Sequence, residues 1–226
     1  MRARARLRSW PVSVSTPGTI SEDRSSTIGQ HGAAGTLTQL TDEELIAGFQ
    51  NGSEPAFNVL VGRYKNQLTN FVFRFMGDPE EAYDVVQETF IRVFRNRNAY
   101  KPVAKFSTWI YTIASNLAKS RLRRRKLRQT FSFSTRREEP APEFDIPDES
   151  SRADSAVEAS MTEERIQKAL DELPAKFREV VVMRDIEELS YEEICAITRL
   201  PMGTVKSRIN RARAQLQESL RDLLSD

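Results

Sequence analysis

The stretch from residue 190 to residue 220 reads SYEEICAITRLPMGTVKSRINRARAQLQESL and predicts two helices joined by a tight turn. Ser190 and Glu193 have the spacing of a capping box, which starts the first helix. Gly203 falls in the segment 199–203 that we expect to form the turn. After the turn, apolar residues recur at helical spacing from Val205 to Leu220. Together these features predict a helix-turn-helix.

The second helix of this motif carries polar and basic residues away from its apolar side. In a helix-turn-helix, the N-terminal part of the second helix reaches base edges in the major groove, and basic side chains also contact phosphates. We therefore predict a face that binds duplex DNA. The alternative is an ordinary amphipathic helix with a basic outer side. The residues of the predicted face are Thr204, Lys206, Ser207, Arg208, Asn210 and Arg211.

Helix signals also occur farther upstream. Thr41 and Glu44 form a second capping box, and apolar residues recur every three to four positions between Phe57 and Phe75. Another helix pattern, which we expect to start near Ser160, leads toward the helix-turn-helix. We therefore predict an all-α protein with two small helical domains, at residues 37–128 and 161–226, joined by a flexible linker.

The remaining segments differ in charge and composition. Residues 1–36 have five Arg, two acids and little apolar content, which predicts a disordered basic leader. The leader faintly resembles a transit peptide, although a solvated leader or a start codon assigned too early explains it better. Residues 129–160 have eight acids and three Arg among Pro and Ser, which predicts an acidic linker.

Composition excludes several classes of protein. The chain has 226 residues and a formal net charge of +2, from 34 Lys+Arg and 32 Asp+Glu. Its one Cys excludes a disulfide framework, and one Cys with one His argues against a zinc site or a Cys–His nucleophile. No apolar run approaches the roughly 18 residues of a membrane span, so we expect a soluble protein.

A long basic stretch lies inside the first predicted domain. Residues 89–137 contain fourteen Lys/Arg and no acid. A predicted helix from residue 106 combines aromatic rings, amides and cations away from its apolar side, as surfaces that bind single-stranded nucleic acid do. A half-buried Trp and Tyr beside a solvated basic tail is the alternative. The residues concerned are Trp109, Tyr111, Thr112, Ser115, Asn116, Lys119, Arg123 and Arg124.

The helix that begins at Pro79 has two contrasting faces on a helical wheel. One should be core and contains Ala82, Val85, Val86, Thr89, Phe90, Val93 and Phe94. The other contains Glu80, Asp84, Gln87, Glu88 and Ile91. This second face is either an ordinary solvated surface with one apolar residue, or a protein-docking surface with Ile91 as its anchor.

Several motifs, taken in order, resemble those of bacterial RNA polymerase sigma factors of the sigma-70 family, in the extracytoplasmic-function group. In the first domain they are DVVQETF (84–90), FSTWI (106–110), Asn116 and RLRR (121–124). In the second they are Leu170-x-x-Leu173-Pro174, Ser190-Tyr191-x-Glu193-Ile194 and GTVKSRINRA (203–212). The resemblance covers about 37–128 and 161–226, as sigma regions 2 and 4.

The resemblance implies specific roles for the two domains. The region 2 helix would dock on the clamp helices of the largest polymerase subunit through Asp84, Gln87, Glu88, Ile91 and Arg92. The minus-ten element would be recognised and melted by the helix from Trp109 to Arg124 and by a base-capturing loop with Asn98, Tyr100 and Lys101. The helix-turn-helix would read the minus-thirty-five element, and region 4 would meet the polymerase flap.

The resemblance also implies partners and location. A sigma factor is not an enzyme and needs no cofactor or metal, because the polymerase performs the chemistry. Its partners would be core RNA polymerase, promoter DNA as duplex and melted strand, and an anti-sigma factor. It would act in the bacterial cytoplasm, held near the membrane only through that anti-sigma factor and not by direct membrane insertion.

Two other functions remain as alternatives. A stand-alone helix-turn-helix regulator would explain residues 190–220 but not the face around Ile91. A carboxylate metal site formed by Glu81, Asp84 and Glu88 would make the protein an enzyme, but no His accompanies them as it does in the Glu-x-x-His di-iron pattern.

Overall fold

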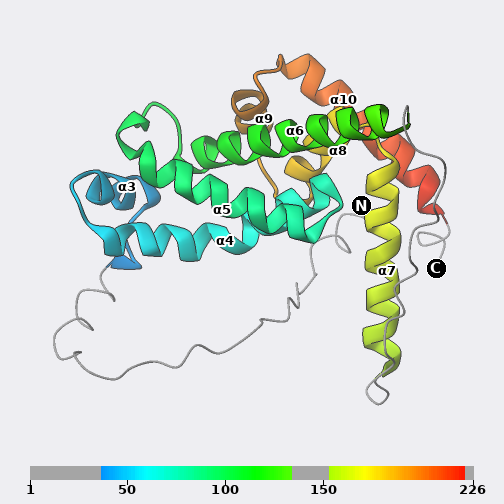
Figure 1. The fold of residues 1–226 in the computed structure, drawn as a ribbon, viewed down its shortest axis with the longest axis horizontal. Helices are drawn as coiled ribbons and strands as arrows, with labels where there is room; N and C mark the ends of the chain where they lie inside the picture. The colour runs from blue at the N-terminus through cyan, green and yellow to red at the C-terminus, as the bar shows by residue number, and fades with distance from the viewer. Residues whose placement is uncertain (1–36, 134–152, 222–226) are drawn as a thin grey trace.

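The computed structural model describes residues 37–133 and 153–221, and all regular elements in these two ranges are helical (Figure 1). This confirms the predicted all-α fold. The predicted leader, residues 1–36, lies outside the described residues, and so does the central part of the predicted linker, 134–152.

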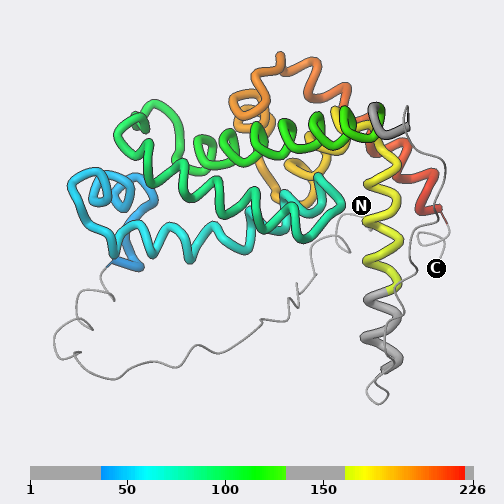
Figure 2. Tube along the Cα trace, viewed as in Figure 1, coloured from blue at the N-terminus to red at the C-terminus, as the bar shows by residue number. Residues whose placement is uncertain are grey.

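Four α-helices form the first helical unit. They are α3 (Asp42–Gln50), α4 (Glu54–Met76), α5 (Pro79–Arg95) and α6 (Phe106–Phe133), with the 3₁₀ turn η1 (Arg97–Ala99) between α5 and α6. Helices α4, α5 and α6 run along one another, and α3 closes one end (Figure 2). The fully buried core side chains include Leu45, Phe49, Leu60, Leu68, Phe71, Phe75, Phe106 and Ile110.

Helix starts in this unit follow the predicted local signals. Thr41 caps α3 by accepting a hydrogen bond from Glu44 N, while the Glu44 carboxylate accepts one from Thr41 N. Asp78 caps α5 by accepting from Glu81 N at 3.0 Å. Gly77 ends α4 with a φ of 74°, a left-handed conformation that glycine adopts without a steric penalty.

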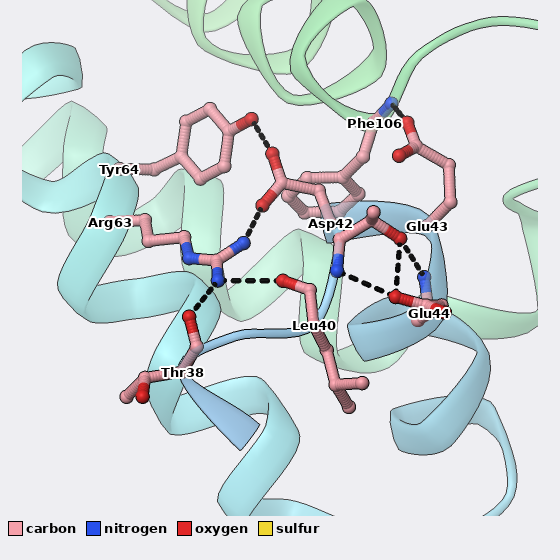
Figure 3. Close-up of polar contacts among 9 residues, drawn as sticks. Thr38, Leu40, Asp42, Glu43, Glu44, Arg63, Tyr64 and Phe106 are labelled. Carbon is pink, nitrogen blue, oxygen red and sulfur yellow. Dashed lines mark hydrogen bonds and ion pairs between the residues drawn. The ribbon is translucent and has the colours of Figure 1, made fainter. Parts of the chain in front are cut away.

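Close to the α3 cap, a polar network joins α3 to α4 and α6 (Figure 3). Asp42 accepts hydrogen bonds from Arg63, at 2.6 Å, and from the Tyr64 hydroxyl. Arg63 also donates to the carbonyls of Thr38 and Leu40. Glu43 accepts from the backbone N–H of Phe106 at 3.1 Å, which satisfies a free donor at the start of α6.

The second unit contains α7 (Ala153–Glu172), α8 (Ala175–Val181), the π-helical turn η2 (Val182–Ile186), α9 (Tyr191–Thr198) and α10 (Met202–Ser219). Its core contains Leu170, Leu173, Phe177, Val180, Ile194, Ile197, Val205, Ile209 and Ala212. The start predicted near Ser160 is wrong, because α7 already begins at Ala153. Helix α6 likewise extends past residue 128, so regular helix enters the predicted linker from both sides.

The two units pack against each other. Helix α6 contacts α9, and α4 contacts α7, α8 and η2 (Figure 1). Buried residues of both units belong to one continuous apolar cluster. The side of α6 that faces away from α5 is therefore covered by the second unit, a contact that helical periodicity does not predict.

Candidate nucleic-acid and protein interfaces

Helix α5 presents its predicted polar face to solvent. Asp84, Gln87, Ile91 and Arg92 are exposed, and 42% of Ile91 is accessible. Glu88 accepts a hydrogen bond from Arg92 at 2.9 Å, and this bond lowers the pKa of the Glu88 carboxyl. An apolar side chain surrounded by polar side chains on a rigid helix has the character of a protein-docking surface.

Phe94 extends this exposed surface. We predicted it as a core residue, and that prediction is wrong because 41% of it is accessible. Its ring contacts Phe49 and Phe57 at centroid distances of 5.3 and 5.5 Å, and the guanidinium of Arg97 lies over it at 5.6 Å. Phe94 sits in the last turn of α5, where α3 and α4 cover only part of the ring.

Two carboxylates of α5 pair with arginines. Asp84 lies 3.4 Å from Arg121 on α6, and Glu88 pairs with Arg92. In the described residues, no group of three His, Cys, Asp or Glu side chains is placed to hold a metal ion. The arrangement therefore gives no support to a metal site formed by Glu81, Asp84 and Glu88.

The loop between α5 and α6 is held in a defined shape. Gln50, at the end of α3, donates hydrogen bonds to the carbonyls of Arg97 at 2.7 Å and Tyr100 at 3.0 Å. Tyr100 is buried, and its hydroxyl donates to the Ala104 carbonyl at 2.9 Å. Asn98 and Lys101 are exposed on this loop. The buried Tyr100 therefore shapes the loop, while Asn98 and Lys101 are accessible to a ligand.

Aromatic rings connect this loop to the start of α6. Trp109 is half-buried, with its ring centroid 5.4 Å from Tyr100 and 6.0 Å from Phe106. Thr112, one turn farther along, is half-buried and donates to the Thr108 carbonyl at 2.6 Å. This end of α6 thus has a partly exposed indole beside an exposed loop, which suits base stacking.

Farther along α6, the predicted nucleic-acid residues divide into two groups. Asn116, Arg123 and Arg124 are exposed, as expected. Tyr111 is only 2% exposed and Ser115 is fully buried, so these two do not lie on a solvated face in this arrangement. Their predicted exposure is wrong because the second unit covers them.

The predicted helix-turn-helix is present in the second unit. Ser190 accepts from Glu193 N at 3.1 Å and Glu193 accepts from Ser190 N at 2.9 Å, so the capping box at α9 is confirmed. The turn residue with positive φ is Arg199, at 58°, whereas Gly203 already lies in the first turn of α10. The turn is therefore made by a left-handed arginine and not by the glycine.

Helix α10 exposes most of its predicted DNA-binding residues. Lys206, Ser207, Asn210 and Arg211 are exposed, and Thr204 and Arg208 are half-buried. The Lys206 ammonium lies 5.6 Å from the Tyr191 ring centroid. The buried side of α10 contains Val205, Ile209 and Ala212, as the apolar spacing predicted. This leaves an outward face of cations, an amide and a hydroxyl.

Both units match protein-family models. Residues 60–128 match Sigma-70 region 2, and residues 163–216 match Sigma-70, region 4. The chain is 34% identical over 194 residues to the RNA polymerase sigma-H factor of Pseudomonas aeruginosa, a match that covers 84% of this chain and 99% of that relative. It is 36% identical over 179 residues to the ECF RNA polymerase sigma factor SigW of Bacillus subtilis, covering 79% and 96%. The chain belongs to the ECF sigma factors of the sigma-70 family.

A solved structure has the same fold as this sigma factor. The sigma factor RpoE of Bartonella quintana, in complex with the anti-sigma factor NepR, aligns with a TM-score of 0.57 at 26% identity. The alignment covers 73% of this chain and 96% of that one. In the described part of this sigma factor, no helix combines the length and hydrophobicity needed to cross a membrane.

We use region 2 for helices α3 to α6 and region 4 for helices α7 to α10. Region 4 covers part of the side of α6 that we predicted to bind single-stranded nucleic acid. Glu179 of α8 accepts hydrogen bonds from Ser115 at 2.6 Å and pairs with Lys119 at 3.1 Å. Glu187, just after η2, accepts from the Tyr111 hydroxyl at 2.6 Å. Three residues of the predicted melted-strand surface, Tyr111, Ser115 and Lys119, therefore contact region 4 of the same sigma factor.

Several of these functional contacts could not be found from sequence. Gln50 holds a loop 47 residues away, and Glu187 meets Tyr111 across 76 residues. Gln50 precedes a predicted Asn-Gly helix end, and Glu187 stands in an acidic run; neither context indicates a partner. Only an alignment of related sequences that co-vary at these positions could have signalled them.

Proposed function

We propose that this sigma factor binds core RNA polymerase, directs it to specific promoters and assists DNA melting during initiation. In this proposal Asp84, Gln87, Glu88, Ile91 and Arg92 dock on the clamp helices of the largest subunit. Region 4 meets the flap and reads the minus-thirty-five element through Thr204, Lys206, Ser207, Arg208, Asn210 and Arg211. Residues 37–128 act as region 2, 161–226 as region 4, and 129–160 connect them.

The minus-ten element and its melted strand belong to region 2 in this proposal. Asn98 and Lys101 approach the strand from the loop, and Tyr100 maintains the shape of that loop. Trp109, Thr112, Asn116, Lys119, Arg123 and Arg124 provide stacking, hydrogen bonds and phosphate contacts along α6, whereas the buried Tyr111 is not assigned a strand contact. Flipping a base into the loop costs a few kcal/mol of unstacking energy, and these contacts would offset that cost.

One observation carries the proposal: an exposed docking surface and an exposed basic helix-turn-helix face occur in the same chain. Ile91 is 42% accessible among polar side chains on α5, and α10 presents Lys206 and Arg211 separately. A stand-alone regulator would need the second surface only. The α5 surface therefore favours a protein that works on DNA together with a large partner.

The wider setting belongs to the same proposal. The protein would act in the cytoplasm and would catalyse no reaction itself, since the polymerase forms the phosphodiester bonds. An anti-sigma factor would be its regulatory partner, as NepR is for the Bartonella quintana protein.

The test compares a double variant on α5 with a matched control on α4. Gln87→Ala with Glu88→Ala should weaken binding to core polymerase by about 30-fold or more, which corresponds to roughly 2 kcal/mol at an interface hot spot. Promoter-dependent transcription on a genomic library should fall accordingly. Asn66→Ala with Gln67→Ala changes two exposed residues of α4 and should alter neither.

A gel shift separates this function from that of a stand-alone regulator. Promoter fragments recovered from the transcription library should shift well only when core polymerase is present. Tight and specific binding by the chain alone, with transcription unaffected by the α5 variant, would overturn the proposal.

A further inference from the structure

The turn of the helix-turn-helix contains an arginine in a conformation that glycine adopts more easily. Arg199 ends α9 with φ 58° and ψ 33°, which is the left-handed region. Helices that end in this conformation usually have Gly there, or sometimes Asn, because a larger side chain brings its Cβ too close to the following carbonyl oxygen. Arg199 therefore introduces a conformational strain that Gly would avoid.

The residues that follow Arg199 fix this conformation. Leu200 packs against the apolar core. Pro201 stands at the N-cap of α10 with φ −60°, and its carbonyl accepts hydrogen bonds from Thr204 N at 2.9 Å and Val205 N at 3.0 Å. A residue that precedes proline is also restricted to extended conformations. The reversal of the chain therefore falls on Arg199, which the turn holds in a set position relative to the first turn of α10.

The Arg199 side chain makes no contact that would explain the strain. The residue is exposed, and among the described residues its guanidinium has no hydrogen bond, ion pair or ring contact. By contrast, Arg178, Arg184 and Arg213 of the same region all donate to carbonyls or carboxylates. A strained residue whose side chain is not used by the fold is a candidate for a functional contact.

The charge around Arg199 indicates the kind of ligand. Between Glu193 and Glu218 the sequence has five Lys/Arg and no acid, and Arg199 is the only one of the five that lies outside α10. A surface of this kind attracts phosphates, and a guanidinium donates strong hydrogen bonds to phosphate oxygens. Arg199 also directly precedes the helix that we propose to read base edges in the major groove, which the DNA backbone borders.

We propose that Arg199 is a phosphate-binding residue of region 4, which holds the DNA backbone beside the minus-thirty-five element while α10 reads the bases. This inference rests on the proposed function and adds a DNA contact to it. The contact has no sequence preference, because phosphates are the same at every base pair. Gly or Asn would form the same turn with less strain, but neither would place a cation next to the recognition helix.

The experiment measures binding of holoenzyme to promoter fragments recovered from the transcription library, at about 50 mM and about 200 mM salt. Arg199→Gly and Arg199→Asn remove the charge and suit the left-handed conformation, whereas Arg199→Lys keeps both the charge and the strain. Lys168→Ala removes an exposed cation of α7, outside the helix-turn-helix, and is the control. Thermal denaturation of each full-length chain gives the second readout.

Arg199→Gly should bind DNA about fivefold more weakly than Lys168→Ala at the lower salt concentration. This deficit should shrink about threefold at the higher one, since losing one phosphate contact lowers the slope of log affinity against log salt by about 0.9. Preferred and altered minus-thirty-five sequences should be weakened equally. Arg199→Asn should match Arg199→Gly, and Arg199→Lys should restore both affinity and salt dependence. Neither neutral variant should lower the melting temperature, because each relieves the strain.

Three results would overturn the proposal. Unchanged affinity and salt dependence in Arg199→Gly would show that Arg199 does not contact phosphate. A lower melting temperature in both neutral variants would show that the cation serves the C-terminal end of α9, where positive charge is favourable. Reduced transcription with unaltered DNA affinity would assign Arg199 to an acidic protein surface instead. Failure of the proposed function is distinguishable, because the wild-type chain would then give no promoter-dependent transcription with core polymerase.

Discussion

Arg211 and Arg213 lie two positions apart on α10 but have different surroundings. Arg211 is exposed. Arg213 forms a two-pronged ion pair with Asp185 of η2, at 2.8 and 2.5 Å, and this hydrogen bonding raises the pKa of the Arg213 guanidinium. An exposed guanidinium can donate hydrogen bonds to a guanine, whereas the donors of a guanidinium that is paired with a carboxylate are already occupied within the fold.

Replacing Arg211 should therefore affect DNA recognition, and replacing Arg213 should affect stability. Arg211→Ala should reduce discrimination between the preferred minus-thirty-five sequence and altered ones by about 1–3 kcal/mol, with little change in melting temperature. Arg213→Ala should lower the free energy of unfolding by roughly 1–3 kcal/mol while leaving base preference intact. Competition gel shifts with holoenzyme and thermal denaturation measure the two effects. Equal loss of discrimination in both variants would contradict this division.

At the scale of elements, the loop between α5 and α6 depends on α3. Gln50 satisfies the carbonyls of Arg97 and Tyr100. Glu43 satisfies the backbone N–H of Phe106 where α6 begins (Figure 3). Both ends of the loop are thus fixed by side chains of one short helix. A loop held at both ends presents Asn98 and Lys101 in a set position, which reduces the entropy lost when a base binds.

Gln50→Leu should test this positioning. The change keeps the approximate size of the side chain but leaves two carbonyls without their donor, at a cost of about 1–3 kcal/mol in unfolding free energy. We expect promoter melting, followed by fluorescence of a base analogue in the minus-ten element, to fall more than core binding does. Gln67→Leu, on the exposed side of α4, is the control. Normal melting by a destabilised Gln50→Leu protein would show that loop shape is unimportant.

At the scale of the whole molecule, closure of region 4 on region 2 should respond to pH. Burial raises the pKa of the Glu187 carboxyl to about 7, although its hydrogen bonds from Tyr111 and Asn70 act in the other direction. Burial and the neighbouring Glu187 raise the pKa of Tyr111, so its hydroxyl remains a donor. In the open chain Glu187 would have an ordinary carboxyl pKa.

The direction of this pH dependence follows from the number of protons that Glu187 binds in the closed and open chains. Between the ordinary carboxyl value of about 4.5 and about 7, the closed chain binds more protons at Glu187 than the open chain. Closure is therefore most favourable at low pH, weakens as pH rises through this range and levels off above it. Energy transfer between dyes at Gln67→Cys on α4 and Gln217→Cys on α10, in a chain with Cys195→Ala, should fall over the same range. Glu187→Gln should flatten that change, and an unaltered pH dependence in this variant would refute the assignment.

Local chemistry made the helices predictable. The caps at Thr41, Asp78 and Ser190 involve partners three residues away, so the sequence itself displays them. Apolar spacing likewise identified the buried sides of α4 and α10. The errors lie at helix ends: α7 begins at Ala153 and not near Ser160, and Phe94 lies in the last turn of α5, where too few neighbours cover it.

The sequence by itself determined the helices, their apolar faces and the family, because these depend on contacts within a few residues and on motifs along the chain. Only the tertiary structure decided which polar side chains remain exposed. Helical spacing places Tyr111 and Ser115 away from the apolar side of α6, where solvent exposure is expected. Both are nevertheless buried, and they contact Glu187 and Glu179 of region 4. The physical reason is that a helix face outside the core takes its environment from whatever packs on it, and periodicity carries no information about that partner.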